Sequence, residues 1–270
     1  MPELPEVETV RRSLLPVTLG RCFGPIVVRE ARLRWPVTPD LASQLAGQRI
    51  HALDRRGKYL IFRLDHGGLI VHLGMSGRLQ RIAVDTAVIK HDHLDLGLDD
   101  GYCLRYNDPR RFGAVLFSDH PESHPLIKGL GLEPLEDGFN GDALYRLTRG
   151  RRVTIKAFIM DAHRIVGVGN IYANEALFRA AIRPSTHAGR LGKARCHTLA
   201  RAITEILVEA IQAGGSTLRD FVDGFGHAGW FQQNYFVYGR AGLACRICAT
   251  PIKVNRDSGR ATYGCPTCQR

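Results

Sequence analysis

The sequence predicts an α+β protein: a β-sandwich that carries an N-terminal helix, then a helical region, and a zinc ribbon at the C-terminus. Three observations support this prediction. Short β-forming segments separated by glycines fill residues 50–118, and a helical period of apolar residues appears only after Gly141. Two Cys-x-x-Cys pairs close the 270-residue chain. Strands that come first and helices that follow are typical of the α+β class.

The helix at the N-terminus is predicted from PELPEVETV at residues 2–10. Pro5 suits the first turn of a helix, where its missing N–H costs nothing. Glu6 and Glu8 fall in the same early turns, where the helix dipole favours negative charge. We therefore expect this helix to hold Pro2 in place.

The strands of the β-sandwich are predicted from KYLIFRL and GGLIVHLGMSGRLQRI, which are rich in β-forming residues and broken by glycines. In HLDLGLDDGYCLRY, apolar residues alternate with polar or small ones on both sides of a turn at Asp100-Gly101, which predicts a hairpin. The alternating residues are Leu94, Leu96, Leu98, Tyr102, Leu104 and Tyr106. Several short strands with frequent turns favour a sandwich.

The helical region is predicted after residue 141. Residues 193–215 place apolar side chains on one helical face, and Gly214 ends the pattern. That face consists of Leu199, Ile203, Ile206, Leu207, Ala210 and Ile211. Shorter helical patterns cover residues 142–150, 154–162 and 170–181.

Two stretches without a period suggest domain limits. Residues 119–141 are rich in Pro, Gly and acidic residues, which indicates a connection between domains. Residues 214–234 are glycine-rich and aperiodic, and a long loop of this kind is usually functional or disordered. We therefore expect a catalytic β-sandwich at 2–130, a linker and helical domain at 131–235 with a functional loop at about 216–234, and a zinc ribbon at 236–270.

The chain carries a formal net charge of +11, and nearly all of it lies in the C-terminal part. Residues 1–150 hold 20 Lys and Arg against 19 Asp and Glu, whereas residues 151–270 hold 17 against 7. An asymmetric basic region is typical of a protein that binds a phosphate backbone. The simpler interpretation is that these cations only keep the surface soluble.

Membrane and secreted classes are not indicated. No apolar run approaches the roughly 18 residues needed to cross a bilayer. The N-terminus also lacks the basic-then-apolar layout of a secretory signal. We therefore expect a soluble, cytoplasmic protein that has no membrane partner.

Four of the seven cysteines have the spacing Cys245-x2-Cys248-x16-Cys265-x2-Cys268, which predicts one tetrahedral zinc ion. Four thiolates leave no open coordination position, so this zinc would be structural. Disulfide bonds are the alternative, although a cytosolic setting disfavours them. The other three, Cys22, Cys103 and Cys196, are expected to be small buried hydrophobes.

Pro2 offers covalent chemistry if the initiator methionine is removed, as is common before a small residue. Its amine would then be secondary and free, with a reference pKa of about 8. Such an amine can attack an aldehyde-level sugar carbon and form an iminium, which acidifies the neighbouring C–H for β-elimination. Glu3 lies next to it and could protonate a sugar oxygen. Taken alone, however, this segment is more simply the start of a helix.

Several motifs together resemble those of the formamidopyrimidine-DNA glycosylases, in the same order. They are PELPEVET, GKYL, HLGMSG, KHDHLDL, NDPRRFG, VGVGNIYANEALF, YGRAG and the terminal cysteine pairs. The resemblance runs from residue 2 to the C-terminus. It implies a bifunctional base-excision repair enzyme, with damaged double-stranded DNA as its partner and a helix–two-turn–helix in the helical domain. We expect a monomer associated with the nucleoid of a bacterial-type cytoplasm.

Such an enzyme flips an oxidised purine, such as 8-oxoguanine or a formamidopyrimidine, out of the duplex, cleaves its N-glycosidic bond, and nicks the strand by β,δ-elimination. By resemblance, Pro2 corresponds to the Schiff-base nucleophile at C1′ and Glu3 to the acid of the glycosylase step. Lys58 corresponds to the proton donor for β-elimination, and Arg260 to the donor for δ-elimination. Without the resemblance, Lys58 would simply be a solvated lysine at a strand edge.

The resemblance also implies the DNA contacts. Met75, Arg110 and Phe112 match the residues that fill the gap left by the flipped nucleotide, as an apolar wedge with a guanidinium for the orphaned cytosine. Phosphate contacts fall on His72, His91, Arg110, Arg151, Asn170 and Arg260. Asn170 is predicted to start a helix, a favourable place for an anion. Lesion-side residues are Glu6, Lys156, Ser216, Leu218, Arg219, Asp220 and Phe221.

Two positions depart from common family patterns, and two alternative functions stay open. Arg151 stands where the family often has lysine, and Ala157 stands where some relatives have proline. One alternative is an endonuclease VIII-like glycosylase for oxidised pyrimidines. The other is a non-catalytic zinc-ribbon protein that binds DNA or RNA, which would explain the charge and the cysteines but not Pro2, Glu3 and Lys58.

Overall fold

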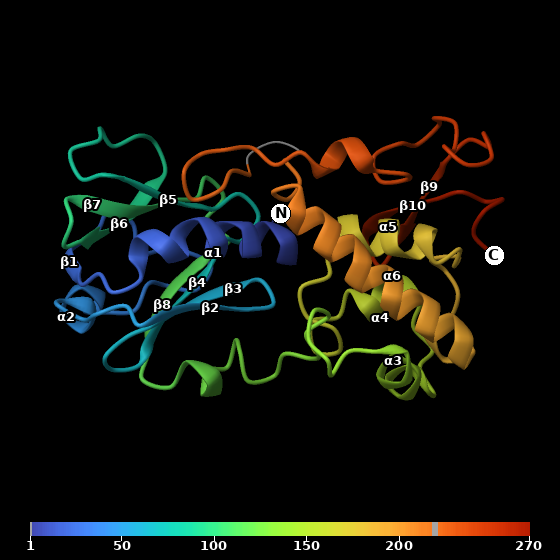
Figure 1. Cartoon of the computed structure of the whole chain (residues 1–270), viewed down its shortest axis with the longest axis horizontal. Coiled ribbons are helices and arrows are strands. Elements are labelled where there is room, and N and C mark those ends of the chain that lie inside the picture. The colour runs from blue at the N-terminus through green and yellow to red at the C-terminus, as the bar shows by residue number, and fades with distance from the viewer. Residues whose placement is uncertain (1, 218–220) are drawn as a thin grey trace. The chain divides into compact units, whose positions relative to one another are not determined.

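The computed structural model describes residues 2–217 and 221–270, and the chain divides into two compact units. The N-terminal unit comprises Met1–Lys128 and Ala213–Trp230, and the C-terminal unit comprises Gly129–Gln212 and Phe231–Arg270. Figure 1 labels the elements of both units along the chain. Within the described part of the chain, no helix has the length and apolar character that a bilayer span requires.

The N-terminal unit contains two four-stranded antiparallel sheets. One has the order β1-β6-β7-β5, formed by Phe23–Val28, Asp92–Leu98, Tyr102–Asn107 and Arg78–Ala83. The other has the order β2-β3-β4-β8, formed by Ala52–Arg56, Tyr59–Arg63, Gly68–His72 and Ala114–Ser118. Helices α1 (Leu4–Thr18) and α2 (Leu41–Leu45) and the 3-10 turn η1 (Pro121–Ser123) complete the unit.

One apolar cluster joins the two sheets to α1, and it confirms the predicted sandwich. Val10 and Leu14 of α1 are fully buried in this cluster, together with Leu60 of one sheet and Leu96 of the other. The helix packs against β2, β3 and β5. Because a helix with one apolar face must bury it, this packing fixes the N-terminus of the chain on the sandwich.

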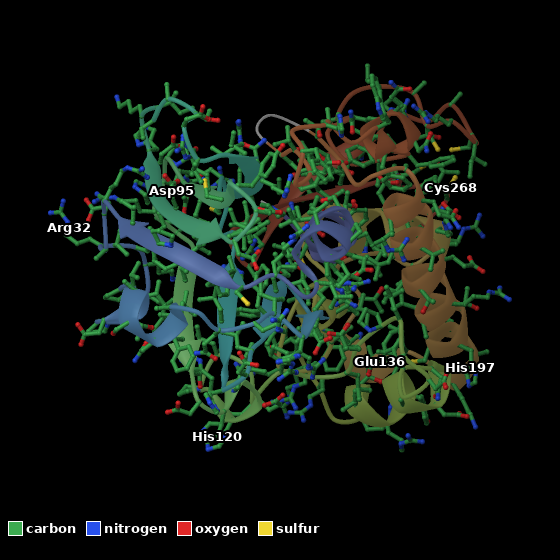
Figure 2. The ribbon with its side chains drawn as sticks, turned by 60° about the vertical axis from the view of Figure 1, so that its left-hand side comes forward. Arg32, Asp95, His120, Glu136, His197 and Cys268 are labelled. Carbon is green, nitrogen blue, oxygen red and sulfur yellow. The ribbon has the colours of Figure 1, made fainter. Side chains whose placement is uncertain are left out.

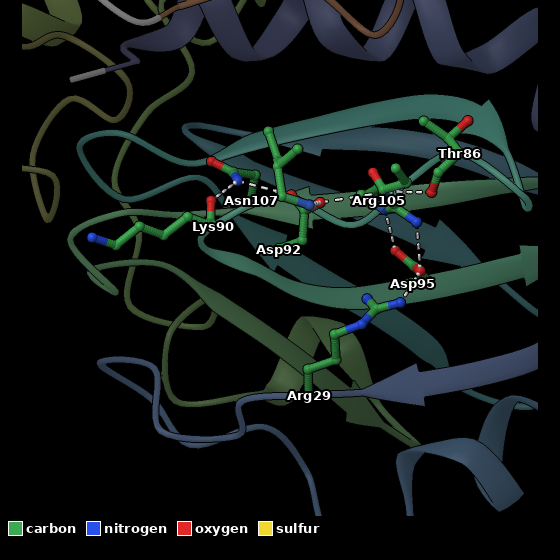
Figure 3. Close-up of polar contacts among 9 residues, drawn as sticks. Arg29, Thr86, Lys90, Asp92, Asp95, Arg105 and Asn107 are labelled. Carbon is green, nitrogen blue, oxygen red and sulfur yellow. Dashed lines mark hydrogen bonds and ion pairs between the residues drawn. The ribbon is translucent and has the colours of Figure 1, made fainter.

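The predicted hairpin is confirmed as β6 and β7, with Leu96 opposite Leu104. All seven residues of β6 are buried, the polar ones included. Asp95 can be buried because its carboxylate binds Arg105 at 2.7 and 2.9 Å and Arg29 at 2.5 Å (Figure 3). Figure 2 contrasts Asp95 with Arg32, which projects from the surface with 82% of its side chain exposed.

The C-terminal unit contains the predicted helices, α3 (Gly141–Thr148), α4 (Ile155–Ile159), α5 (Asn170–Arg179) and α6 (Lys193–Gln212), with the 3-10 turns η2 (Ala188–Arg190) and η3 (Phe231–Asn234). Helix α6 packs against α3 and α5. Its predicted apolar face is buried throughout, at Leu199, Ile203, Ile206, Leu207, Ala210 and Ile211.

The C-terminal ribbon is an antiparallel hairpin of β9 (Lys253–Asp257) and β10 (Arg260–Gly264), placed between the two cysteine pairs. A small apolar cluster supports it, in which Val237 and Ile252 pack with Cys245 and Cys265. The predicted ribbon is therefore present, and Phe178 of α5 shares the apolar cluster that supports it.

Some features of the N-terminal unit differ from the predictions. Cys103 and Cys196 are buried as predicted, but Cys22 is only half-buried, so that prediction is wrong for Cys22. Strand β1 was not predicted, because Pro25 interrupts FGPIVV; a proline is tolerated in this strand because β1 lies at the edge of its sheet. The described residues of the loop Ala213–Trp230 cluster with this unit.

Candidate functional site

The N-terminus of α1 is fixed by reciprocal hydrogen bonds. Glu3 is the N-cap residue; its backbone N–H donates to Glu6 Oε2 at 2.8 Å, and its own carboxylate accepts from the backbone of Glu6. This capping box satisfies N–H groups that a helix otherwise leaves unpaired. Pro2 and Glu3 are both buried. The two residues predicted to carry the covalent chemistry therefore lie at a rigid helix start.

The Glu6 carboxylate also holds the predicted lesion loop. Its Oε1 accepts the backbone N–H of Ser216 at 2.8 Å. Gly215 has a φ of +79°, and a Cβ there would lie 3.2 Å from both Glu6 Oε1 and a ring carbon of Phe221. Glycine fits because the positive φ is strained for any other residue and a side chain would be tightly packed. Glu6, Ser216 and Phe221 thus come together, whereas three further predicted residues lie outside the described part: Leu218, Arg219 and Asp220.

Lys58 lies at the tip of the β2–β3 hairpin, and a buried carboxylate supports that hairpin. Arg55 donates to Glu8 Oε2 at 3.1 Å and to the carbonyl oxygen of Gly57 at 3.1 Å. Burial opposes the charge on Glu8, but hydrogen bonds from arginines, Arg11 first, overcome it and lower the pKa of Glu8 to about 2. Glu8 therefore ties the Lys58 hairpin to α1. No pattern in the sequence singled out Arg55 for this role.

His72, at the end of β4, is a neutral imidazole at physiological pH. Burial lowers the pKa of His72 to about 4, and the charges of Lys58 and Arg34 act in the same direction. Its Nδ1 accepts the N–H of Gly74 at 3.1 Å, which leaves the ring proton on Nε2. A phosphate contact from His72 would therefore be a hydrogen bond from a neutral ring and not an ion pair.

Two turns carry the predicted gap-filling residues, and one buried carboxylate joins them. Asp108, which is 0% exposed, accepts from the Ser76 hydroxyl at 2.8 Å and from the Gly113 N–H at 3.0 Å. A Cβ on Gly74 would lie 2.5 Å from the carbonyl carbon of Phe112, so the turns pack backbone on backbone. Asp108 was not selected from the sequence, although it belongs to the motif NDPRRFG.

Met75, Arg110 and Phe112 project from these turns. Met75 and Phe112 are each 39% exposed, so both apolar tips are open to solvent. The guanidinium carbon of Arg110 lies 4.6 Å from the centre of the Phe112 ring. Exposed apolar tips on rigid turns, next to a cation, have the chemistry of a wedge that enters a base stack.

His91 lies just before β6 in a left-handed conformation, with a φ of 74°. Its carbonyl oxygen accepts the backbone N–H of Asp108 at 3.1 Å. Arg105, from the charge network of Figure 3, donates to the carbonyl oxygens of Thr86 and Ala87, at 3.0 Å each. Buried charges therefore fix the loop that ends at His91.

In the C-terminal unit, buried side chains hold the strand that begins with Arg260. The ammonium of Lys156, a residue only 1% exposed, donates to the carbonyl oxygen of Ala261 at 2.8 Å and to the Thr262 hydroxyl at 2.7 Å. Asn170, the first residue of α5, donates to the same carbonyl oxygen at 3.1 Å. Lys156 and Asn170 therefore converge on the residue next to Arg260.

Glu175 was not selected from the sequence, although it lies in the motif VGVGNIYANEALF. It is 2% exposed and accepts backbone N–H groups from Phe236, Val237 and Tyr238 at 2.9, 2.9 and 2.7 Å. This carboxylate fixes the segment that leads into the ribbon. Arg151, in contrast, is exposed on the loop between α3 and α4.

The four cysteines predicted to bind zinc converge, and their Sγ atoms all lie within 4.8 Å of one another. The Sγ atoms of Cys248 and Cys265 are 3.4 Å apart, and those of Cys245 and Cys268 are 3.9 Å apart; Figure 2 labels Cys268. Thiolates about 2.3 Å from a tetrahedral zinc would be about 3.8 Å from each other. The four cysteines therefore form a group suited to a metal ion with sulfur ligands.

Comparisons with known proteins agree along the whole chain. A family model for the formamidopyrimidine-DNA glycosylase N-terminal domain matches residues 1–115, and one for the formamidopyrimidine-DNA glycosylase H2TH domain matches residues 130–222. The chain is 55% identical over 271 residues to the formamidopyrimidine-DNA glycosylase of Thioalkalivibrio sulfidiphilus, and the match covers 100% of both proteins.

Solved structures give the same result. The MutM (Fpg) protein from Thermus thermophilus superimposes with a TM-score of 0.89 at 38% identity, covering 99% of this chain and 98% of that one. Fpg of Lactococcus lactis, in a complex with DNA containing an abasic site, gives 0.92 at 35% identity, covering 99% of each chain. The predicted family is confirmed: the chain belongs to the formamidopyrimidine-DNA glycosylase family and is a DNA glycosylase.

Proposed function

We propose that this DNA glycosylase removes oxidised purines, such as 8-oxoguanine and formamidopyrimidines, from duplex DNA and then nicks the strand by β,δ-elimination. One observation carries the proposal. The Glu6 carboxylate binds the Glu3 N–H and the Ser216 N–H, so the start of the helix and the loop share an anchor. A nucleophile at such a start is held in one orientation, as covalent catalysis requires. The adjoining loop suits an enclosure for a flipped base.

The covalent step begins when removal of the initiator methionine frees the Pro2 amine. The Pro2 nitrogen bonds to C1′ while the N-glycosidic bond breaks, and the departing base takes up the proton that the amine loses. Glu3 protonates O4′ as the sugar ring opens, which leaves an iminium between Pro2 and C1′. The iminium draws electrons from the neighbouring carbon, so loss of a C2′ proton expels the 3′-phosphate. We assign proton transfers of the β- and δ-eliminations to Lys58 and Arg260, respectively.

The DNA contacts follow from the two turns and from the C-terminal unit. Met75, Arg110 and Phe112 fill the space of the flipped nucleotide, because their tips are exposed on turns that Asp108 makes rigid. The proposed phosphate contacts are His72, His91, Arg110, Arg151, Asn170 and Arg260. Lys156 serves the lesion side by holding the hairpin of Arg260, since its ammonium already bonds Ala261 and Thr262.

The metal at the four cysteines is proposed to be one structural zinc ion. Four thiolates at these distances suit tetrahedral zinc and leave no ligand position for substrate water. The zinc would stabilise the ribbon, and the ribbon presents Arg260. The functional divisions are proposed as residues 2–130 for catalysis, 131–235 for the helix–two-turn–helix and lesion loop, and 236–270 for the ribbon. We further propose that the protein acts as a monomer on the bacterial nucleoid.

Borohydride trapping tests the covalent step. The protein with a free Pro2 amine should form a reduced covalent adduct with a damaged duplex, and Pro2→Gly should abolish most of it. A removable N-terminal tag is the matched control: tagged protein should give no adduct, and cleavage that exposes Pro2 should restore it. Equal trapping before and after cleavage would rule out Pro2 as the nucleophile.

Substrate choice tests the purine assignment. Excision from an 8-oxoguanine:cytosine duplex should be faster than excision from a thymine-glycol duplex at equal enzyme concentration. A clear preference for thymine glycol would instead support an endonuclease VIII-like function. Specific binding without excision of either lesion would support the non-catalytic alternative.

A further inference from the structure

A second group of cations in the C-terminal unit lies around a surface cavity of about 400 Å³. The cavity is lined by Gly150, Arg151, Arg152, His187, Gly189 and Arg190. Its three arginines and its histidine are all exposed, and no acidic residue lines it. Of these residues, only Arg151 was indicated by the family resemblance.

The three arginines have no carboxylate partner within residues 2–217 and 221–270. The neighbouring Arg149 instead uses its guanidinium within the fold, where it donates to the carbonyl oxygen of Leu191 at 2.6 Å. Guanidinium groups gathered without an acid repel one another, and an anion in the cavity would remove that repulsion. The cluster therefore has the charge of a site for an anionic group.

The two loops that carry these cations are joined through their backbones. The Gly189 N–H donates to the carbonyl oxygen of Arg151 at 3.0 Å, and a Cβ on Gly189 would lie 2.7 Å from that oxygen. The Ala188 N–H donates to the carbonyl oxygen of Val153 at 2.9 Å, and His187 Nδ1 contacts the carbonyl oxygen of Arg152. The main chain thus holds the two loops together before any ligand arrives, so the loops need not be ordered by binding, which lowers its entropic cost.

The same segment continues into the hairpin of Arg260. Thr154, two residues after Arg152, donates from its hydroxyl to Asp257 Oδ2 at 2.6 Å, and Asp257 pairs with Arg260 across the hairpin. The cavity and Arg260 therefore belong to one connected module of the C-terminal unit. A ligand that engages one is well placed to engage the other if it is long and carries repeated phosphates.

We propose that this cavity binds a phosphate group of the DNA backbone, with Arg152 and Arg190 as additional phosphate contacts beside Arg151. Guanidinium groups match phosphate oxygens through paired N–H donors, which explains the use of arginine at this site. The inference rests on DNA as the partner and deepens the proposed function. It enlarges the DNA contact surface without adding a residue to the chemistry.

The test is the salt dependence of DNA binding by the zinc-loaded, full-length protein. Duplex affinity is measured by fluorescence anisotropy across a chloride series, with undamaged DNA and with a duplex that carries a stable abasic-site analogue. Each lost phosphate contact should reduce the slope of log K against log salt by about 0.9. The double variant Arg152→Ala/Arg190→Ala should therefore lose about 2 from the slope and bind at least about 10-fold more weakly at roughly 0.1 M salt.

Two further variants make the result specific. Arg152→Lys/Arg190→Lys keeps both charges and should retain most of the slope. Arg201→Ala is the matched control, because Arg201 is an exposed arginine with a carboxylate partner, Glu205, at 3.7 Å; its slope should stay at the wild-type value. An unchanged slope in the double alanine variant, with its zinc content and melting temperature retained, would overturn the assignment.

Free inorganic phosphate is the alternative ligand for the cavity, because it offers the same oxygen atoms as the DNA backbone. The melting temperature of the wild type in inorganic phosphate is compared with that in chloride of equal ionic strength. If phosphate raises it more, and the double alanine variant loses this effect while its salt slope for DNA is unchanged, the cavity is a free-anion site and the DNA assignment is wrong. Failure of borohydride trapping would refute the Pro2 chemistry alone, because the salt slope is measured without any reaction.

Discussion

The two units of the protein use arginine in opposite ways. In the N-terminal unit, some arginines bind buried carboxylates: Arg105 binds Asp95 and Arg55 binds Glu8. In the C-terminal unit, Arg151, Arg152 and Arg190 are exposed around a cavity without an acidic lining. Net charge also changes along the chain: residues 1–150 are nearly balanced, whereas residues 151–270 have a large excess of cations. An excess of basic residues therefore indicates a binding surface only when the cations that form ion pairs within the protein are not counted.

The difference also separates positioning from binding. Buried ion pairs seldom stabilise a fold more than apolar packing would, but removal of one partner leaves a charge stranded. In the N-terminal unit a paired arginine can also hold a loop: Arg105 donates to the carbonyl oxygens of Thr86 and Ala87. The comparison predicts that losing a buried acid there costs stability, and that losing the arginines around the cavity of the C-terminal unit costs DNA affinity.

The largest effect is expected from loss of the metal. Cys265→Ser should release zinc and unfold the ribbon, because structural zinc contributes about 10–16 kcal/mol to small zinc domains. Duplex binding should fall with zinc content, while the unfolding transition of the N-terminal unit should persist. Metal analysis, anisotropy and thermal unfolding measure the three quantities. Full duplex affinity in zinc-free protein would contradict a DNA-binding role for the ribbon.

The next largest effect is expected at Asp95. Asp95→Ala leaves Arg105 and Arg29 without their shared carboxylate and should lower the free energy of unfolding by about 3–5 kcal/mol. Urea unfolding measures this loss. Glu122→Gln is the control, because Glu122 pairs with Arg63 at an exposed site and should change stability by less than about 1 kcal/mol. Equal losses in the two variants would remove the distinction between internal and surface pairs.

Glu8 gives a smaller effect with a defined pH window. Its pKa is about 2 in the folded protein against an ordinary value of 4.5. A lowered folded-state pKa means that the stabilisation is complete above about pH 4.5 and is lost as the pH falls toward 2. Glu8→Gln should cost about 2–3 kcal/mol at neutral pH and should flatten stability against pH in this acidic window.

The matching readout for Glu8 is strand scission, because the residue supports the hairpin of Lys58, to which we assign the proton transfer of β-elimination. Strand scission by Glu8→Gln should slow more than initial duplex binding does. Parallel stability profiles of the variant and the wild type below pH 4.5 would show that the carboxylate is not the titrating group.

The smallest effect is expected on the surface of the C-terminal unit. Arg179 and Glu209 form an ion pair at 2.6 Å with both side chains partly exposed. Because exposed pairs are screened by solvent and salt, Glu209→Gln should change the free energy of unfolding by about 1 kcal/mol or less. Urea unfolding at low and high salt checks this value. A loss as large as that expected for Asp95→Ala would break the comparison between the units.

The predictable part of the fold was the part with regular patterns. The period of α6, the hairpin at Asp100-Gly101 and the spacing of the cysteines each depend on local sequence, and each appears in the structure. Strand β1 was missed because Pro25 interrupts its pattern, and its partner β6 lies more than 60 residues further along the chain. Edge strands depend on pairing that no local window contains.

The candidate site divides in the same manner. The family resemblance, together with the sequence, pointed to Pro2, Glu3 and the exposed tips, because such residues are the ones that touch a ligand. Asp108 and Glu175 were missed, since each acts through backbone N–H groups that come together only in the folded chain. A buried carboxylate and a solvated one look the same in a sequence. The motifs that contain Asp108 and Glu175 were identified, but their hydrogen bonds could not be predicted from the sequence.

The shared anchor at Asp108 has a consequence for engineering. Since one carboxylate holds both turns, the side chains of Met75, Arg110 and Phe112 can be substituted without disturbing the backbone that carries them. Under the proposed function, attempts to change which base is tolerated opposite a lesion should therefore begin at these three side chains. A substitution of Asp108 itself would instead displace all three side chains together.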